Sequence, residues 1–145
     1  MNVMPIRLGV VVSLGAAVLA LAAPAPAHHA FSAEFDASRP IELQGTVTRM
    51  EWINPHSWIT IDVVRADGGI DTWEIEAGAP NAMFRRGFTR DSLPVGTEIV
   101  VNGYRAKDGG MRANGRDLTL PDGQRLFVGS SGTGAPEDDG DPSEQ

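Results

Sequence analysis

No cysteine occurs among the 145 residues of this chain. Its absence excludes disulfides, iron–sulfur clusters, thiol catalysis and attachment of a lipid to a cysteine. Positive charge is also scarce, because 12 Lys and Arg stand against 19 Asp and Glu and the net charge is −7. Proteins that bind nucleic acids or anionic membrane surfaces need clustered positive charge. The composition therefore argues against both kinds of partner.

Long hydrophobic runs are missing as well. The longest, residues 8–23, is shorter than the about 20 apolar residues that a membrane-spanning helix needs. It follows a basic residue and precedes Ala-Pro-Ala at residues 25–27. This layout predicts a secretory signal peptide over residues 1–27 that is cleaved after Ala27. We expect a periplasmic or secreted protein with no membrane anchor after cleavage, whose first residue is His28.

The C-terminal segment, residues 129–145, is rich in Gly, Ser and Pro and contains no Lys or Arg. Its apolar side chains are no larger than Ala or Pro, so their burial cannot offset the entropy lost on ordering. Its acidic residues are Glu137, Asp138, Asp139, Asp141 and Glu144. We expect a disordered acidic tail, which leaves residues 28–128 as a single domain.

Between these ends, apolar and polar residues alternate with the period of two that is typical of strands. The alternation and the Gly-rich turns predict six strands, at residues 41–52, 58–65, 70–77, 98–106, 111–120 and 124–128. Gly45 interrupts the first strand and predicts a bulge or a sharp bend there. We expect Trp73 and Ile75 of the third strand to face inward.

One segment, residues 78–87, has the pattern of a short helix. Pro80 lies near its start, Arg85 and Arg86 lie in its last turn, and Gly87 ends it. Three meandering strands, a short helix and further strands follow one another in OB-type barrels. We therefore predict an all-β domain with a small α contribution, an OB-like Greek-key barrel of five to six strands with the helix between strands three and four. A small open β-sandwich is the alternative.

Several short segments between His28 and about Ser130 carry a resemblance to a known family. They are His28–Ser32, Gly45–Val47, Glu51–His56, Pro80–Ala82, Arg85–Gly87, Lys107–Gly109 and Leu120–Gly123. Together they resemble a bacterial family of small exported proteins, defined as a domain of unknown function (DUF6152). The resemblance implies an exported single domain and supplies no catalytic or binding residue.

The three histidines, His28, His29 and His56, are the candidate metal ligands. An N-terminal histidine chelates copper through its amine and a ring nitrogen, and a second histidine completes a T-shaped set of three nitrogens. His56 follows Asn54 and Pro55 in a turn between the first two strands. The alternative is a frayed N-terminus and a turn histidine that binds nothing. Copper is the one cofactor that this pattern indicates.

Two further groups of side chains are candidates for binding a small ligand or a protein partner. Trp52 and Trp58 lie near His56 in sequence and could wall a pocket, with core packing as the alternative. Arg85 and Arg86, with Arg90, form a local basic patch in an acidic protein. It could bind an anion or a partner, with stabilisation of the helix C-terminus as the alternative.

The sequence offers little for catalysis. It contains no Gly-x-Ser-x-Gly, His-Glu-x-x-His or Walker motif. Glu74 and Glu76 lie two apart on one strand, and we expect both on its solvent face. We therefore assign no catalytic residue and favour a non-enzymatic module that binds a partner or a small ligand. A copper-binding protein that uses His28 and His56 is the alternative, and a copper oxidase is a third hypothesis.

Overall fold

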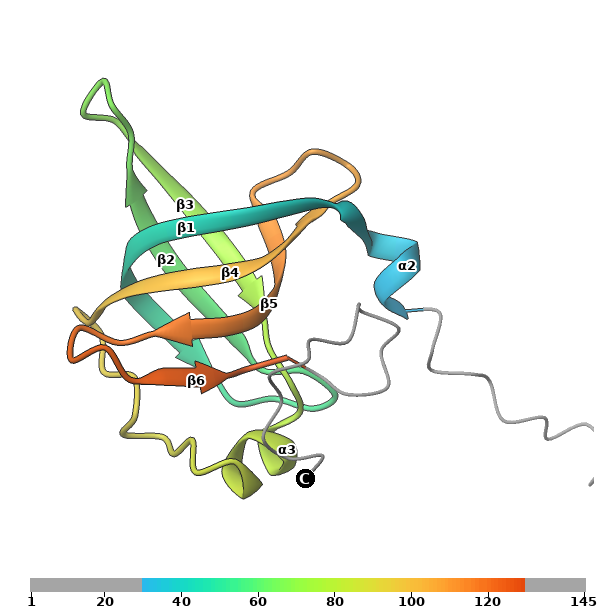
Figure 1. Ribbon diagram of the computed structural model, residues 1–145, viewed down its shortest axis with the longest axis vertical. Coiled ribbons are helices and arrows are strands. Elements are labelled where there is room, and N and C mark those ends of the chain that lie inside the picture. Colours follow the sequence, from blue (N-terminus) through green and yellow to red (C-terminus); the bar gives the residue numbers. More distant parts are fainter. Residues whose placement is uncertain (1–29, 130–145) are drawn as a thin grey trace, which may run out of the picture.

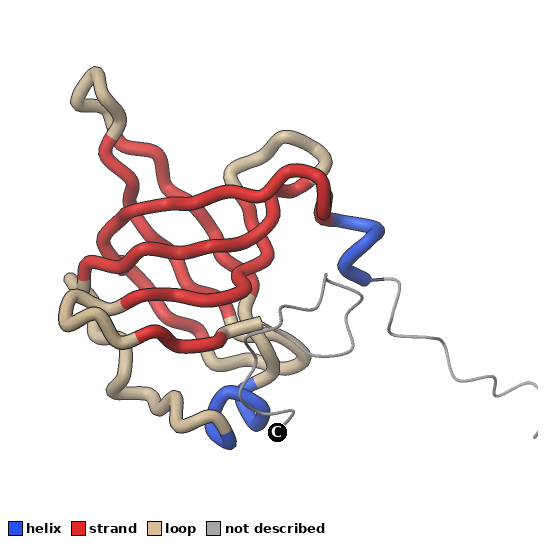
Figure 2. Tube along the Cα trace, viewed as in Figure 1, coloured by secondary structure: helices blue, strands red, loops and turns tan. Residues whose placement is uncertain are grey.

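A computed structural model describes residues 30–129 (Figures 1 and 2). The predicted signal peptide, the predicted acidic tail beyond Gly129, and both His28 and His29 lie outside the described residues. The elements are α2 (Ala30–Glu34), β1 (Phe35–Glu51), β2 (Trp58–Val64), β3 (Ile70–Glu76), α3 (Pro80–Arg85), β4 (Glu98–Ala106), β5 (Arg112–Thr119) and β6 (Arg125–Phe127). Over residues 30–129, neither helix has the length and apolar character needed to cross a bilayer.

All six strands belong to one sheet with the order β3-β2-β1-β4-β5-β6, in which neighbours are antiparallel. In addition, β3 pairs with β5 in parallel, from Glu74 opposite Arg112 to Glu76 opposite Asn114. This pairing closes β1 to β5 into a ring of hydrogen bonds, and β6 extends the sheet beyond β5 (Figure 1). The prediction of a mostly β, OB-like fold with a short helix between strands three and four is confirmed. A β-sandwich needs two sheets, and all six strands belong to one, so the β-sandwich alternative is wrong.

The alternation in the sequence places one face of each strand inside the ring. The buried core contains Val47, Ile59, Ile61, Trp73, Ile75, Ile99, Val101 and Leu118, one or more from each of β1 to β5. Met83 of α3 and Phe88 just after it are also buried in this core. The inward direction predicted for Trp73 and Ile75 is thus confirmed.

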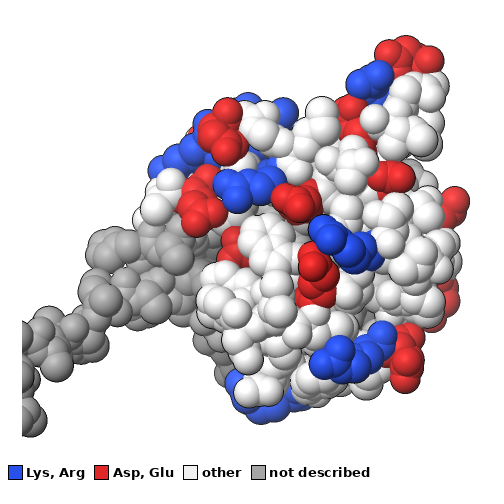
Figure 3. All heavy atoms as spheres, turned by 180° about the vertical axis from the view of Figure 1, so that it is seen from behind, with Lys and Arg blue, Asp and Glu red and all other residues white. Residues whose placement is uncertain are grey.

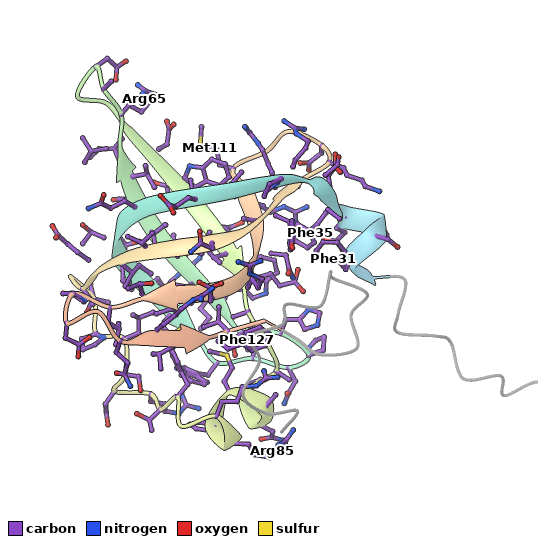
Figure 4. The ribbon with its side chains drawn as sticks, in the orientation of Figure 1. Phe31, Phe35, Arg65, Arg85, Met111 and Phe127 are labelled. Atoms are coloured by element: carbon purple, nitrogen blue, oxygen red, sulfur yellow. The ribbon has the colours of Figure 1, made fainter. Side chains whose placement is uncertain are left out.

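The N-terminal part of the domain differs from the prediction. The first strand begins at Phe35 rather than residue 41, and a short helix, α2, precedes it. Pro40 and a register shift between Phe35 and Pro40 break the alternation, so the pattern does not reveal the strand there. Phe31 and Phe35 pack with Tyr104 in a second small buried cluster that anchors α2 (Figure 4).

The bulge that is one of the two features predicted at Gly45 lies elsewhere in β1. The register shift between β1 and β2 lies further along, between Val47 and Arg49. A Cβ atom on Gly45 would lie 2.7 Å from the backbone oxygen of Asp62. The residue is therefore glycine because the neighbouring strand approaches closely, and the bulge itself lies elsewhere.

Trp73→Ala tests the core. Trp73 is 7% exposed, and the guanidinium of Arg105 lies 5.3 Å from the centre of its ring. Removing a buried aromatic side chain should lower the free energy of unfolding by about 3–5 kcal/mol, measured by urea denaturation. Ile70→Ala on the same strand is the control, because Ile70 is 60% exposed. If the two substitutions lowered the free energy of unfolding equally, the placement of Trp73 in the core would be contradicted.

Candidate functional site

The loop between β1 and β2 is held against the ends of other strands, near the bottom of the view in Figure 1. Ser57 donates its backbone N–H to the carbonyl of Gly78 at 3.0 Å, and Gly78 donates to the carbonyl of Val128 at 2.7 Å. These bonds join the loop to the segment after β3 and to the end of the described chain. They fix His56 beside Glu76, the last residue of β3.

His56 and Glu76 form the best-defined polar pair of this region. Nδ1 of His56 is in direct contact with Oε1 of Glu76, and when this carboxyl is ionised the ring N–H donates a hydrogen bond to it. The histidine side chain is 23% exposed and the glutamate side chain only 8%. With Nδ1 as the donor, neutral His56 carries its proton on Nδ1 and leaves a lone pair on Nε2. The buried carboxylate thus orients a more exposed imidazole.

This arrangement corrects the expectation that Glu76 lies on a wet face. Glu74, on the same face of β3, is exposed, whereas the β1–β2 loop covers Glu76. Burial raises the pKa of the Glu76 carboxyl above its usual value, and the charge of His56 partly opposes this shift. The alternating pattern could not reveal the burial, because the covering loop is distant in sequence from β3.

The charges around Glu76 link this pair to α2. Glu34 raises the pKa of Glu76 further, while Arg112 lowers it. Arg112 Nη2 also lies 3.7 Å from Oε2 of Glu34. Lys107 holds α2 from the β4–β5 turn, donating its Nζ to the carbonyl of Ser32 at 2.6 Å. The helix that directly follows His28 and His29 is therefore anchored close enough to Glu76 for its charge to act there.

The pair does not form a nucleophilic triad with the adjacent serine. Ser57 is fully buried, and its hydroxyl has no hydrogen-bond partner among residues 30–129. A buried hydroxyl cannot meet a substrate, so the chemistry that the pair supports is ligation or proton exchange through Nε2 of His56.

His56 is the one predicted metal ligand that the structure describes. Within residues 30–129 there is no group of three or more His, Asp or Glu side chains that could hold a metal ion. A metal on His56 would therefore need further ligands from outside this range, where His28 and His29 lie.

The predicted ligand-binding residues lie in the β1–β2 loop, at the start of β2 and around the end of α3. Trp58 is half-buried at the start of β2. Trp52 stacks on Phe84 of α3, with ring centres 4.9 Å apart, and also contacts Phe88. Arg85 is exposed on α3.

Arg86 lies nearer the end of the described chain. Its guanidinium is 4.6 Å from the centre of the Phe127 ring. Its Nη1 donates to the carbonyl of Gly129 at 2.8 Å. Trp52 and these arginines were candidates from the sequence, whereas Phe84 and Phe127 were not. The sequence around a single aromatic residue in a short element does not show which side chain it contacts.

Comparison with known families settles the family of the chain. Residues 16–115 match the sequence profile of a family of unknown function, DUF6152. The chain belongs to this family. The match confirms the assignment to DUF6152, and it spans α2, β1, the β1–β2 loop and β3, which together form the His56–Glu76 pair and its surroundings. A search of curated proteins finds no match to the chain.

Replacing Glu76 by Gln tests the burial of its carboxyl. A carboxyl whose pKa is higher in the folded state favours folding while protonated, and this contribution is lost as the pH rises through the folded-state value. The free energy of unfolding of the wild type, minus that of Glu76→Gln, should therefore fall as the pH rises above about 4.5, the usual value for a glutamate carboxyl. Urea denaturation of the metal-free proteins measures it. A difference that stays flat or grows over this range would contradict the assignment.

Proposed function

We propose that this protein is an exported, non-enzymatic binding module whose ligand is Cu(II), bound by Nε2 of His56 together with the mature N-terminal residue His28. The hydrogen bond from His56 to the buried Glu76 carries this proposal. Ligating histidines almost always donate their second ring N–H to a carboxylate, a carbonyl or water, which fixes the ring and raises its basicity. His56 and Glu76 have this relation.

The remaining donors would come from the N-terminus. Cleavage after Ala27 gives His28 a free amine beside its imidazole. The amine nitrogen, one ring nitrogen of His28 and Nε2 of His56 together make three nitrogen donors. Three nitrogen donors suit the tetragonal geometry that Cu(II) prefers. No cysteine is present to favour Cu(I) or zinc instead.

The anchoring of α2 supports this assignment. Because α2 begins at Ala30, His28 is two residues from an ordered helix. Two extended residues reach about 7 Å, so little chain would have to be ordered for His28 to bind. The charge of Glu34, at the end of this short helix, acts on Glu76, which lies directly behind His56.

The experiment is titration of Cu(II) into protein whose N-terminus is His28, monitored by calorimetry and by electron paramagnetic resonance. We expect one copper per chain with nitrogen hyperfine coupling. Removing an outer partner of a ligand weakens metal binding by about 10–100-fold, so Glu76→Gln should fall in this range and His56→Ala should weaken binding more. Affinity should also fall on acidification, because Cu(II) must displace protons from its ligands.

Two controls separate this site from general copper binding. His29→Ala should have a smaller effect than His56→Ala, because adjacent residues of an extended chain point in opposite directions. An extra methionine before His28 should abolish the chelate formed with the terminal amine. Absence of Cu(II) binding at neutral pH, or equal affinity of the wild type and His56→Ala, would overturn the proposal.

A further inference from the structure

The segment after β3 carries three arginines within six residues, Arg85, Arg86 and Arg90. Two of them lie over aromatic rings: Arg86 is 4.6 Å from the ring centre of Phe127, and Arg90 is 5.7 Å from that of Trp52. Cation–π contacts hold a guanidinium in place without neutralising its charge. The contact of Arg90 with Trp52 therefore holds a positive charge in place at this end of the molecule.

Apolar side chains are exposed beside these charges. Phe84, which stacks on Trp52, is 42% exposed, and Ile53 in the β1–β2 loop is 52% exposed. We call the set of Arg85, Arg86, Arg90, Trp52 and Phe84 the arginine–aromatic surface. It lies at the end opposite to the β2–β3 hairpin, as the labels of Arg85 and Arg65 show in Figure 4.

Few acidic groups oppose this positive charge. Asp91 is the single acidic residue from Met83 to Val95. Among residues 30–129, no ion pair joins Arg85 or Arg90 to a carboxylate. On the face seen from behind, acidic and basic side chains are interspersed (Figure 3). The arginine–aromatic surface is therefore suited to an acidic partner.

The chain itself supplies an acidic segment next to this surface. Gly129, the last described residue, accepts a hydrogen bond from Nη1 of Arg86 at 2.8 Å, so the described chain ends beside that arginine. The segment from Glu137 to Glu144 contains five Asp and Glu and no Lys or Arg. Eight extended residues span about 26 Å, which is the reach of Glu137 from Gly129.

We propose that the acidic segment 137–144 binds the arginine–aromatic surface of its own chain. Each exposed ion pair contributes at most about 1 kcal/mol, so a free peptide of this composition would bind weakly. A short tether raises its effective concentration to the millimolar range, which is enough to populate a weak contact. This inference is independent of copper, because it uses neither His56 nor His28.

A spin label in the tail tests this contact in the full chain. Since the protein has no cysteine, Ser143→Cys gives a single attachment site for a nitroxide. Amide signals of residues 84–90 and the indole N–H of Trp52 should lose about half or more of their intensity at low salt. They should recover in about 1 M NaCl, where the Debye length falls to about 3 Å. Signals around Arg65, at the opposite end, should be unaffected.

Matched variants identify the charges involved. The double variant Arg85→Gln and Arg90→Gln should abolish the signal loss, whereas Arg65→Gln should not, because Arg65 already pairs with Asp67 and Asp71. Neutralising the tail should also abolish it, with the substitutions Glu137→Gln, Asp138→Asn, Asp139→Asn, Asp141→Asn and Glu144→Gln.

Three outcomes would overturn the proposal. The first is signal loss that is absent at low salt or spread evenly over the domain. The second is loss that persists after the tail is neutralised. The third is loss that appears when spin-labelled and isotope-labelled chains are mixed, because this would assign the contact to a second copy.

Discussion

Three residues of β3 pair in parallel with three residues of β5, and this short ladder turns a linear sheet into a closed ring. The backbones of β4 and β5 lie very close together near the point where the ring closes. A Cβ atom on Gly103 would lie 2.1 Å from the backbone oxygen of Asn114, which itself pairs with Glu76. Opposite Asn102 and Gly103 the register skips Arg116, so β5 carries a bulge at this point. Closure therefore depends on a residue without a side chain.

The candidate site is a consequence of this closure. The ladder ends at Glu76, and the β1–β2 loop crosses that end, so a carboxyl that would face solvent in an open sheet is buried against His56. Burying a carboxyl is costly unless hydrogen bonds compensate, and one imidazole N–H provides such a bond. The free-energy cost of burying Glu76 is tolerated if the pair has a function. For a carboxylate that contacts a more exposed imidazole, that function is to orient the ring nitrogen that binds a ligand.

Much of the fold was predictable from the sequence, because local patterns govern it. The alternation of apolar residues located β2 to β5 to within a residue or two at each end, and Pro80 and Gly87 marked the limits of the helical segment. What escaped prediction depends on contacts between distant residues. α2 is stabilised by Phe31 against Tyr104, and the partner of His56 lies twenty residues further along the chain. Neither contact has a local signature.

The account rests on the protonation of His56 in the metal-free protein, and this is directly measurable. Long-range correlation of ring protons with ¹⁵N distinguishes the two neutral tautomers of histidine, and variants of His28 and His29 assign the signals. The account predicts that neutral His56 is protonated at Nδ1, where it donates to Glu76, and that Glu76→Gln disturbs this preference. A proton on Nε2 in the wild type would leave no free nitrogen for a ligand and would contradict the account.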